Sequence, residues 1–224
     1  MQTVILISAN AEWQAILELF PQAELQDTPY GGWFETHLTP SECPVIFFHG
    51  GWGKIAAAAS TQYAVDRWHP GLLVNLGTCG GIEGRAAEGT VILAERTLVY
   101  DIIEQMGDPD EAIAYYTTTI DLSWLGDELP KGVRRGLLVS ADRDLLAEEI
   151  PMLCERFGAA AGDWESGAIA WVAARNEVRC LILRAVSDVV GSAGDATYGQ
   201  YERFVERTRE IMRGLVERLT GKIL

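Results

Sequence analysis

Two carboxylates in the last third of the chain, Glu165 and Asp188, stand where site residues are expected. Asp188 follows a near-continuous apolar run over residues 180–186, which predicts a strand buried on both faces of a parallel sheet. Glu165 follows a run of small residues and precedes a helix predicted over 166–176, whose amino end favours an ionised carboxylate. Ligands of open α/β sheets bind beyond the carboxyl ends of the strands, so we expect both side chains to face one pocket.

Glu12 is a third candidate acid at a strand end. Residues 4–7 are apolar and predict the first strand, and apolar residues at positions 13, 16, 17 and 20 predict one face of the helix that follows. Glu12 falls in the first turn of that helix, so it can reach the same crevice as the other two carboxylates. Any helix amino end favours a carboxylate, however, and the position alone leaves a purely structural role open.

Two glycine-rich loops lie between predicted strands and helices. Residues 50–54 precede an alanine-rich helix, but Ile55 stands where a Walker loop needs Ser or Thr, which excludes a nucleoside triphosphatase. Residues 77–81 follow a predicted strand, and Thr78 offers a hydroxyl and backbone amides where a ligand can approach closely. Their spacing is not G-x-G-x-x-G, so the dinucleotide-binding fingerprint is not met.

The composition limits the class of protein. The length of 224 residues predicts a single domain over 1–224, and 32 acidic against 18 basic residues oppose binding to nucleic acid or to an anionic membrane. The four cysteines and three histidines have no metal-ligand spacing, so we expect no metal, no cofactor and reduced thiols in a cytoplasmic protein. The apolar start lacks basic residues and breaks at Asn10, which predicts a strand rather than a signal peptide.

The motif D-x-E-S-G-A at residues 163–168 and the motif R-A-V-S-D at 184–188 resemble those of the purine nucleoside phosphorylase and nucleosidase superfamily. They are most similar to its methylthioadenosine/S-adenosylhomocysteine nucleosidase branch. The resemblance implies a three-layer α/β/α fold around a mixed, mostly parallel twisted sheet. It also implies a cytoplasmic homodimer that hydrolyses the N-glycosidic bond of a purine nucleoside and releases the free base.

The resemblance implies a role for each matching residue. In this superfamily the position of Glu165 holds the ribose hydroxyls, and the position of Asp188 protonates the departing purine. Arg184 and Ser187 fall where the family supports that Asp. Glu12 falls where the nucleosidase branch has the Glu that activates the attacking water.

The identity of the nucleophile depends on residues 75–81. They are similar to the family's N-x-G-[ST]-x-G-G, whose Ser or Thr, here Thr78, contacts the ribose or the water. Phosphorylases of this superfamily usually have an Arg where Asn75 stands, and a Gly-Asp-Pro type loop that this chain lacks, so the resemblance favours water. Two alternatives are a phosphorylase that uses Arg85, Arg96 or Arg143, and a module that binds a nucleoside without cleaving it.

Asp144 departs from the family pattern, because adenosine-cleaving members have a base-stacking aromatic residue there. Trp164 or Trp52 is the alternative stacking surface, and another purine or modified nucleoside stays an alternative substrate. A helix is predicted over 142–157, ended by a glycine, and a last helix over about 198–219. Residues 100–135 have no match in the family and are expected to form a lid, an interface or a surface excursion.

Overall fold

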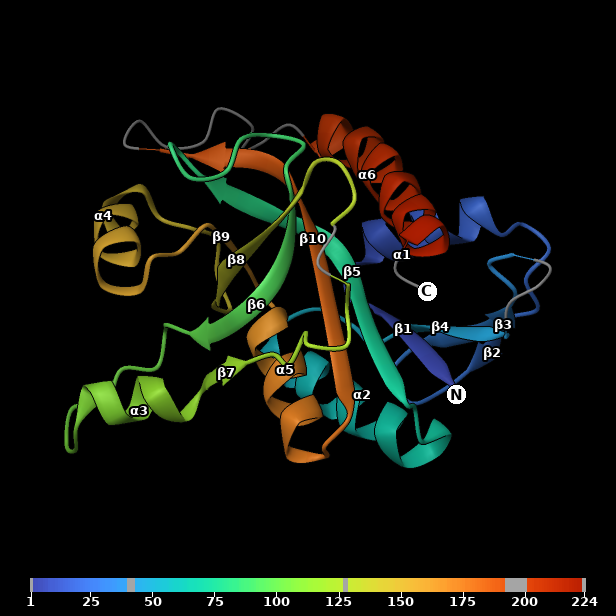
Figure 1. Cartoon of the computed structure of the whole chain (residues 1–224), viewed down its shortest axis with the longest axis horizontal. Coiled ribbons are helices and arrows are strands. Elements are labelled where there is room, and N and C mark those ends of the chain that lie inside the picture. The colour runs from blue at the N-terminus through green and yellow to red at the C-terminus, as the bar shows by residue number, and fades with distance from the viewer. Residues whose placement is uncertain (1, 40–42, 127–128, 192–200, 223–224) are drawn as a thin grey trace.

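The computed structural model describes residues 2–39, 43–126, 129–191 and 201–222, which build a mixed ten-stranded sheet (Figure 1). The order of the strands is β10-β6-β8-β9-β5-β1-β4-β3-β2, and β7 pairs with β6. The strands are β1 (Thr3–Ile7), β2 (Gln26–Asp27), β3 (Gly32–Thr36), β4 (Val45–His49), β5 (Leu72–Ile82), β6 (Val91–Val99), β7 (Thr117–Thr119), β8 (Val133–Ser140), β9 (Ala161–Asp163) and β10 (Arg179–Val190).

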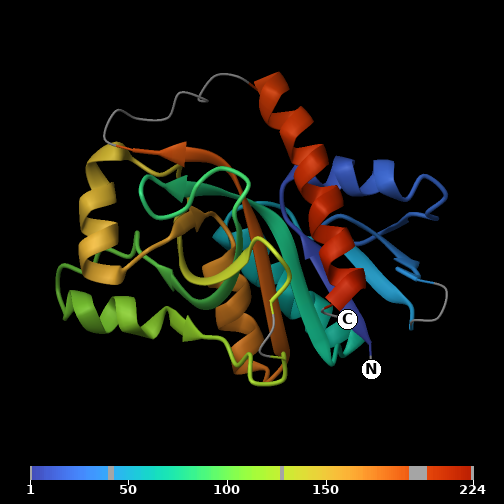
Figure 2. The same cartoon turned by 45° about the horizontal axis from the view of Figure 1, so that its top comes forward.

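Helices cover both faces of this sheet, as Figures 1 and 2 show. The helices are α1 (Asn10–Leu19), α2 (Lys54–Trp68), α3 (Pro109–Tyr115), α4 (Ile150–Met152), α5 (Ser166–Arg175) and α6 (Tyr201–Lys222). Helix α2 packs against α5 on one face, and α1 packs against α6 on the other. Buried alanines and hydroxyl residues on α2 keep its packing on the sheet close. The predicted three-layer α/β/α architecture is confirmed.

The central strands form a closed ring. Strand β5 pairs with β10 and β9, β10 pairs with β6, and β8 joins β6 to β9. Strand β5 also pairs in parallel with β1, so it connects the ring to the open part of the sheet. The ring therefore brings the ends of β5, β8, β9 and β10 together at one place.

Strands β5 and β10 are long because their apolar runs are buried on both faces. The register of their parallel pairing shifts between Val186 and Asp188, so Ser187 is the extra residue of a β-bulge. Bulges bend a strand and redirect its side chains, and they are frequent beside active sites. This bulge sets the direction of the Asp188 side chain.

Three local predictions needed correction or lie outside the described residues. The helix predicted over 142–157 begins only with a 3₁₀ turn at Ala147–Glu149, continues as α4 and ends in a π-helical turn, Leu153–Phe157, before Gly158 at φ 70°. Residues 100–135 hold helix α3 and strand β7, which extends the sheet. The described part of the last helix begins at Tyr201, and the predicted start at 198 lies outside the described residues.

Among the described residues, no helix is long and apolar enough to cross a membrane.

Candidate active site

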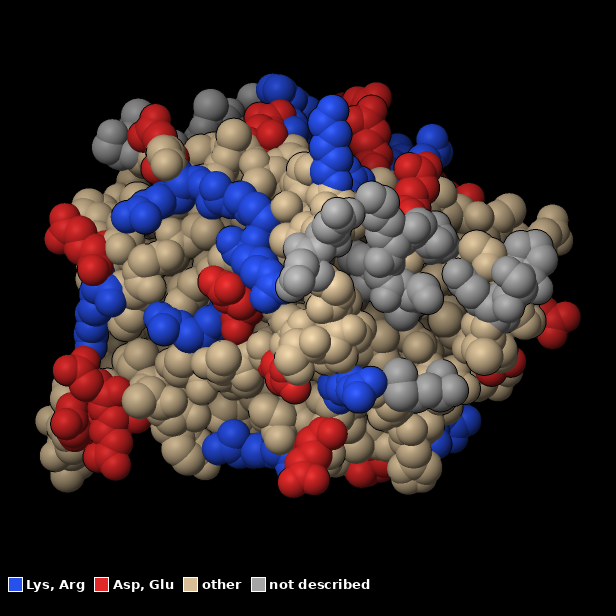
Figure 3. All heavy atoms as spheres, viewed as in Figure 1, with Lys and Arg blue, Asp and Glu red and all other residues tan. Residues whose placement is uncertain are grey.

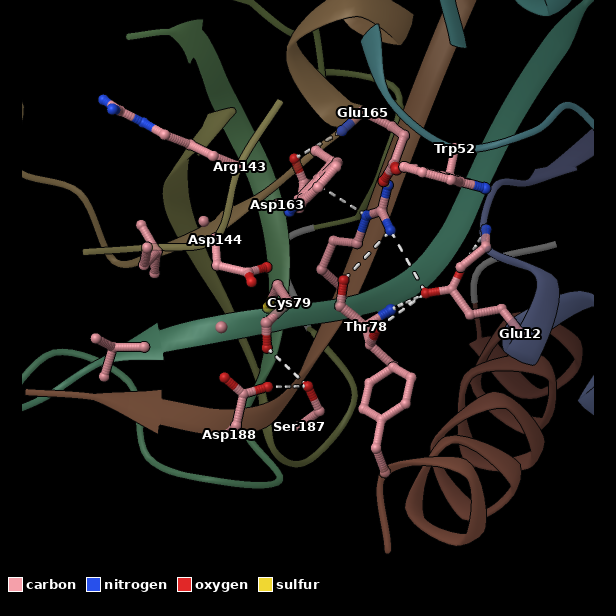
Figure 4. A pocket seen from close by; sticks show the side chains of 18 of the residues that line it. Glu12, Trp52, Thr78, Cys79, Arg143, Asp144, Asp163, Glu165, Ser187 and Asp188 are labelled. Atoms are coloured by element: carbon pink, nitrogen blue, oxygen red, sulfur yellow. Dashed lines mark hydrogen bonds and ion pairs between the residues drawn. The ribbon is translucent and has the colours of Figure 1, made fainter. Parts of the chain in front are cut away.

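A cavity of about 520 Å³ opens where these strands end. The seven residues that the sequence predicted for catalysis and substrate binding all line it, although they come from four separate elements or loops (Figure 4). These residues are Glu12, Thr78, Trp164, Glu165, Arg184, Ser187 and Asp188. The edge of the sheet thus gathers side chains that are up to 176 positions apart in the chain, from Glu12 to Asp188.

Arg184 is the centre of the charge network, with 1% of its surface exposed. Its Nε lies 2.9 Å from Asp163 Oδ2, its Nη2 lies 3.2 Å from Glu165 Oε2, and its Nη1 lies 3.7 Å from Glu12 Oε1. Burial opposes the positive charge, but the carboxylates of Asp163, Glu165 and Glu12 raise the pKa of the guanidinium. Arg184 therefore pairs with these three carboxylates, and its predicted role as a support of Asp188 stays a prediction.

Glu165 lies between Arg184 and the loop before α2. Its Oε1 accepts a hydrogen bond of 3.0 Å from the Gly53 amide, while Oε2 faces the guanidinium. Burial raises the pKa of Glu165 to about 7, with the charges of Asp163 and Glu12 adding to the rise and Arg184 and the Gly53 amide opposing it. The carboxyl group is thus poised between its neutral and ionised forms near neutral pH.

Asp163 is a member of this network that sequence reasoning did not assign. Its Oδ1 accepts hydrogen bonds from Ser140 Oγ at 2.7 Å and from the Ser166 amide at 3.1 Å, so it joins the end of β8 to the start of α5. Its Oδ2 contacts Ser166 Oγ and Arg184. The signal was present, since Asp163 is the first letter of the D-x-E motif.

Glu12 is buried and points into the same network. Its Oε1 accepts hydrogen bonds from the Thr78 amide at 2.6 Å and from Thr78 Oγ1 at 2.9 Å. Its Oε2 accepts one of 3.2 Å from the Ala9 amide at the start of α1. Glu12 therefore stabilises its own helix and also belongs to the site, so the two roles that the sequence left open coexist.

Asp188 stands at the other end of the cavity and is only half-buried. Ser187 Oγ contacts Asp188 Oδ1 and lies 3.3 Å from the carbonyl oxygen of Cys79. A hydroxyl has one proton to donate. Ser187 Oγ is the donor in both contacts, so Asp188 Oδ1 and the Cys79 carbonyl oxygen share that proton. The predicted support of Asp188 by Ser187 agrees with this contact.

The remaining wall of the cavity holds Asp144, which departs from the family pattern, and the two alternative stacking residues, Trp52 and Trp164. The carboxylate of Asp144 points into the cavity on the same side as Asp188 (Figure 4). Trp164 and Trp52 meet edge to face with ring centroids 5.7 Å apart, and Trp52 is 58% exposed at the mouth. Both indoles line the cavity, so each presents an apolar surface to a ligand.

The residues considered for phosphate binding are dispersed. Asn75 lies in the sheet, where its Nδ2 donates a 2.9 Å hydrogen bond to the Leu6 carbonyl, and it does not line the cavity. Arg85 and Arg96 line a separate hollow, within a face where Figure 3 shows Lys and Arg side chains over β6 and β8. Arg143 lines the cavity and is paired with Glu149. Among the described residues, no group of His, Cys, Asp and Glu is arranged to hold a metal ion.

The fold and this cluster of carboxylates define a nucleoside phosphorylase-like protein. The family model described as the phosphorylase superfamily matches residues 3–220, and the chain belongs to that superfamily.

Relatives of known name agree with the nucleosidase branch. The chain is 26% identical over 173 residues to the 5'-methylthioadenosine/S-adenosylhomocysteine nucleosidase of Listeria innocua, covering 70% of this chain and 74% of the relative. It is 27% identical to the nucleosidase of Thermotoga maritima, covering 71% and 73%.

Solved structures show the same fold at lower identity. The native futalosine hydrolase of Helicobacter pylori superposes with a TM-score of 0.80 at 18% identity, covering 98% of this chain and 97% of that one. The MTA/SAH nucleosidase of Streptococcus pneumoniae in complex with 8-aminoadenine gives a TM-score of 0.78 at 18% identity, covering 99% and 100%.

Proposed function

We propose that this protein is a purine nucleosidase, which hydrolyses the N-glycosidic bond and releases the free base. The observation that carries the proposal is the placement of Glu12 and Asp188 on different sides of one cavity, with Glu165 on a third (Figure 4). N-glycosidic hydrolysis needs a positioned water, a proton for the leaving base and a grip on the sugar. Three separate carboxylates supply these three needs.

Each carboxylate has one step in the reaction. Asp188 donates a proton to N7 of the purine as the bond between C1′ and N9 breaks. Glu165 accepts hydrogen bonds from the ribose hydroxyls, and this fixes the sugar while positive charge develops on it. Glu12 takes a proton from water as the water oxygen attacks C1′, so the products are the base and the free sugar. Thr78 orients Glu12 through its two hydrogen bonds.

The charge of the cavity favours water over phosphate as the nucleophile. The guanidinium beside Glu12 is that of Arg184, and each of its three nitrogen atoms already faces a carboxylate. A phosphate dianion placed there would meet the carboxylates of Glu12, Asp163 and Glu165, which already pair with the guanidinium of Arg184. A water molecule carries no such penalty.

The substrate that the named relatives suggest is methylthioadenosine or S-adenosylhomocysteine. The neutral purine of both, and the apolar methylthio group of the first, suit a cavity walled by Trp52 and Trp164. Asp144 supports a second candidate, a nucleoside of a 6-oxopurine. Its carboxylate accepts a hydrogen bond from the N1–H of hypoxanthine or guanine, whereas adenine has only a lone pair at N1. By analogy with the nucleosidase branch we also propose a cytoplasmic homodimer.

The test compares Asp188→Asn with wild-type protein on a panel of adenine and 6-oxopurine nucleosides, with base release followed by chromatography. We expect kcat to fall by about 10² to 10⁴, because the departing base loses its proton donor. The control Glu111→Gln removes an exposed carboxylate of α3 that lies outside the cavity, and it should leave the rate unchanged. Unchanged turnover in Asp188→Asn would refute the assignment of the acid.

A further inference from the structure

The loop that carries Trp52 and Gly53 is held by charged residues from two other places in the fold. Lys54 Nζ contacts Asp101 just after β6 and lies 3.6 Å from Asp142 Oδ2 just after β8. Asp142 Oδ1 accepts a 2.7 Å hydrogen bond from the Lys54 amide, across 88 positions of sequence. The Asp142 amide in turn donates a 3.1 Å hydrogen bond to Asp101 Oδ2.

This network replaces the missing cap of helix α2. Gly53 is the N-cap residue and has no side chain to cap with, and the first turn of α2 contains no acidic residue. The first amides of a helix need acceptors from elsewhere, and anions are stabilised there by the helix dipole. Two carboxylates supply these acceptors. Asp142 accepts a hydrogen bond from the Lys54 amide, and Glu165 accepts one from the Gly53 amide.

The two hydrogen bonds are mechanically linked because they come from consecutive amides. Gly53 has φ 83°, and a Cβ at this position would lie 3.3 Å from Asp142 Oδ1. Asp142 thus packs directly on the backbone whose amide reaches Glu165 at 3.0 Å. Asp142 does not line the cavity, but the amide that it accepts from is next to the amide that donates to Glu165.

We propose that Asp142, with Lys54 and Asp101, is a positioning residue that holds the Gly53 amide on Glu165 and so fixes the carboxylate that grips the ribose. The part concerning ribose rests on the proposed function. The groups that face Glu165 are Arg184 from β10, Asp163 from β9, Glu12 from α1 and the Gly53 amide before α2. Of these, only the Gly53 amide depends on Asp142.

The experiment uses full-length Asp142→Ala with a ribonucleoside and with the matching 2′-deoxynucleoside. If Asp142 acts through the grip on the sugar hydroxyls, kcat/KM on the ribonucleoside falls about tenfold while kcat/KM on the deoxynucleoside changes less than about twofold, since the two losses share one interaction. Hydrogen exchange of the Gly53 and Lys54 amides, followed by NMR, reports the pinning itself, and we expect both to exchange at least about tenfold faster.

Two further variants serve as controls for Asp142→Ala. Asp142→Asn keeps the shape of the side chain and should give a smaller effect of the same pattern. Glu148→Ala removes an exposed carboxylate from the same connection after β8 and should change neither readout. Equal losses on both nucleosides, or amide exchange unchanged by Asp142→Ala, would overturn the proposal. If wild-type protein cleaves neither nucleoside, the proposed function fails, and amide exchange still decides whether Asp142 pins the loop.

Discussion

Three buried carboxylates share one guanidinium in this site, and that ratio governs their ionisation. Asp163, Glu165 and Glu12 all lie within 3.7 Å of Arg184, and all four side chains are almost fully buried. Ionising all three leaves uncompensated negative charge in a poorly solvated place. Burial and the negative charges of its acidic neighbours raise the pKa of Glu165 to about 7, so this carboxyl group takes up a proton most readily. The site therefore contains a carboxyl group with a pKa near neutral pH, which is typical of functional sites.

The raised pKa of Glu165 predicts that Glu165→Gln makes the protein more stable at high pH. The folded pKa of Glu165 is about 7 and the unfolded value is 4.5, so the protonated form stabilises the wild-type fold fully below 4.5, and this contribution is lost as the pH rises through 7. At pH 8 the variant should be more stable by on the order of 2 kcal/mol, with no gain at pH 4.5. Denaturant unfolding at both pH values measures this, and a variant less stable at pH 8 would contradict it.

The chemistry-bearing carboxylates could be predicted from the sequence, but their connections could not. Glu12 and Glu165 stand at the starts of helices and Asp188 stands at the bulge near the end of β10, and all three line one cavity. The support of Asp188 by Arg184 stays a prediction taken from the family resemblance, and the sequence did not indicate that Arg184 also pairs with three other carboxylates. The three actual partners come from α1 and the β9–α5 connection, and only the folded sheet sets those distances.

At the scale of elements, the pairing of β5 with β10 makes room for the guanidinium. Gly77 lies opposite Arg184 in this register, and a Cβ on Gly77 would lie 2.1 Å from Arg184 Nη1 and 2.7 Å from Glu12 Oε1. An arginine at the surface would swing aside. Arg184 is buried and held by three carboxylates, so it has nowhere to move.

Gly77→Ala should therefore damage both stability and activity. Overpacking of this kind costs about 1 to 3 kcal/mol, and displacing Arg184 from Glu12 and Glu165 should lower kcat/KM by about tenfold or more. Thermal unfolding and steady-state kinetics measure the two effects. Gly126→Ala is the matched control, because nothing lies within 4 Å of a Cβ there. Normal activity in Gly77→Ala would show that Arg184 is free to move.

Long apolar elements were predictable, whereas short irregular ones were not. The apolar runs of β5 and β10 favour buried strands, and both strands are confirmed. Both run further than predicted, because the glycine-rich residues 77–81, expected as a loop, belong to β5, and Asp188 lies within β10. The segment after β8 has helical spacing, but Pro151 has no amide hydrogen to donate, and the chain passes from a 3₁₀ turn through α4 to a π-helical turn there. The capping of α2 by Asp142 was not predictable, since nothing local links residues so far apart in sequence.

At the scale of the molecule, the sheet holds residues from both ends of the chain at one edge. The ring of β5, β10, β6, β8 and β9 carries Thr78, Asp163, Arg184 and Asp188, and the open part of the sheet brings in Glu12 after β1. The predicted superfamily and fold are confirmed, because the family model spans residues 3–220. The base and its substituent depend on the cavity wall, where Asp144 departs from the family pattern and Trp52 and Trp164 are the alternative stacking surfaces, so motifs alone do not determine the substrate.

The most direct test of the account is the identity of the sugar product. A cleavable nucleoside is incubated with the protein with and without inorganic phosphate, and the sugar is analysed by mass spectrometry. The account predicts free sugar, formed at the same rate in both buffers, because Glu12 activates water. A sugar 1-phosphate, formed only in phosphate buffer, would contradict it.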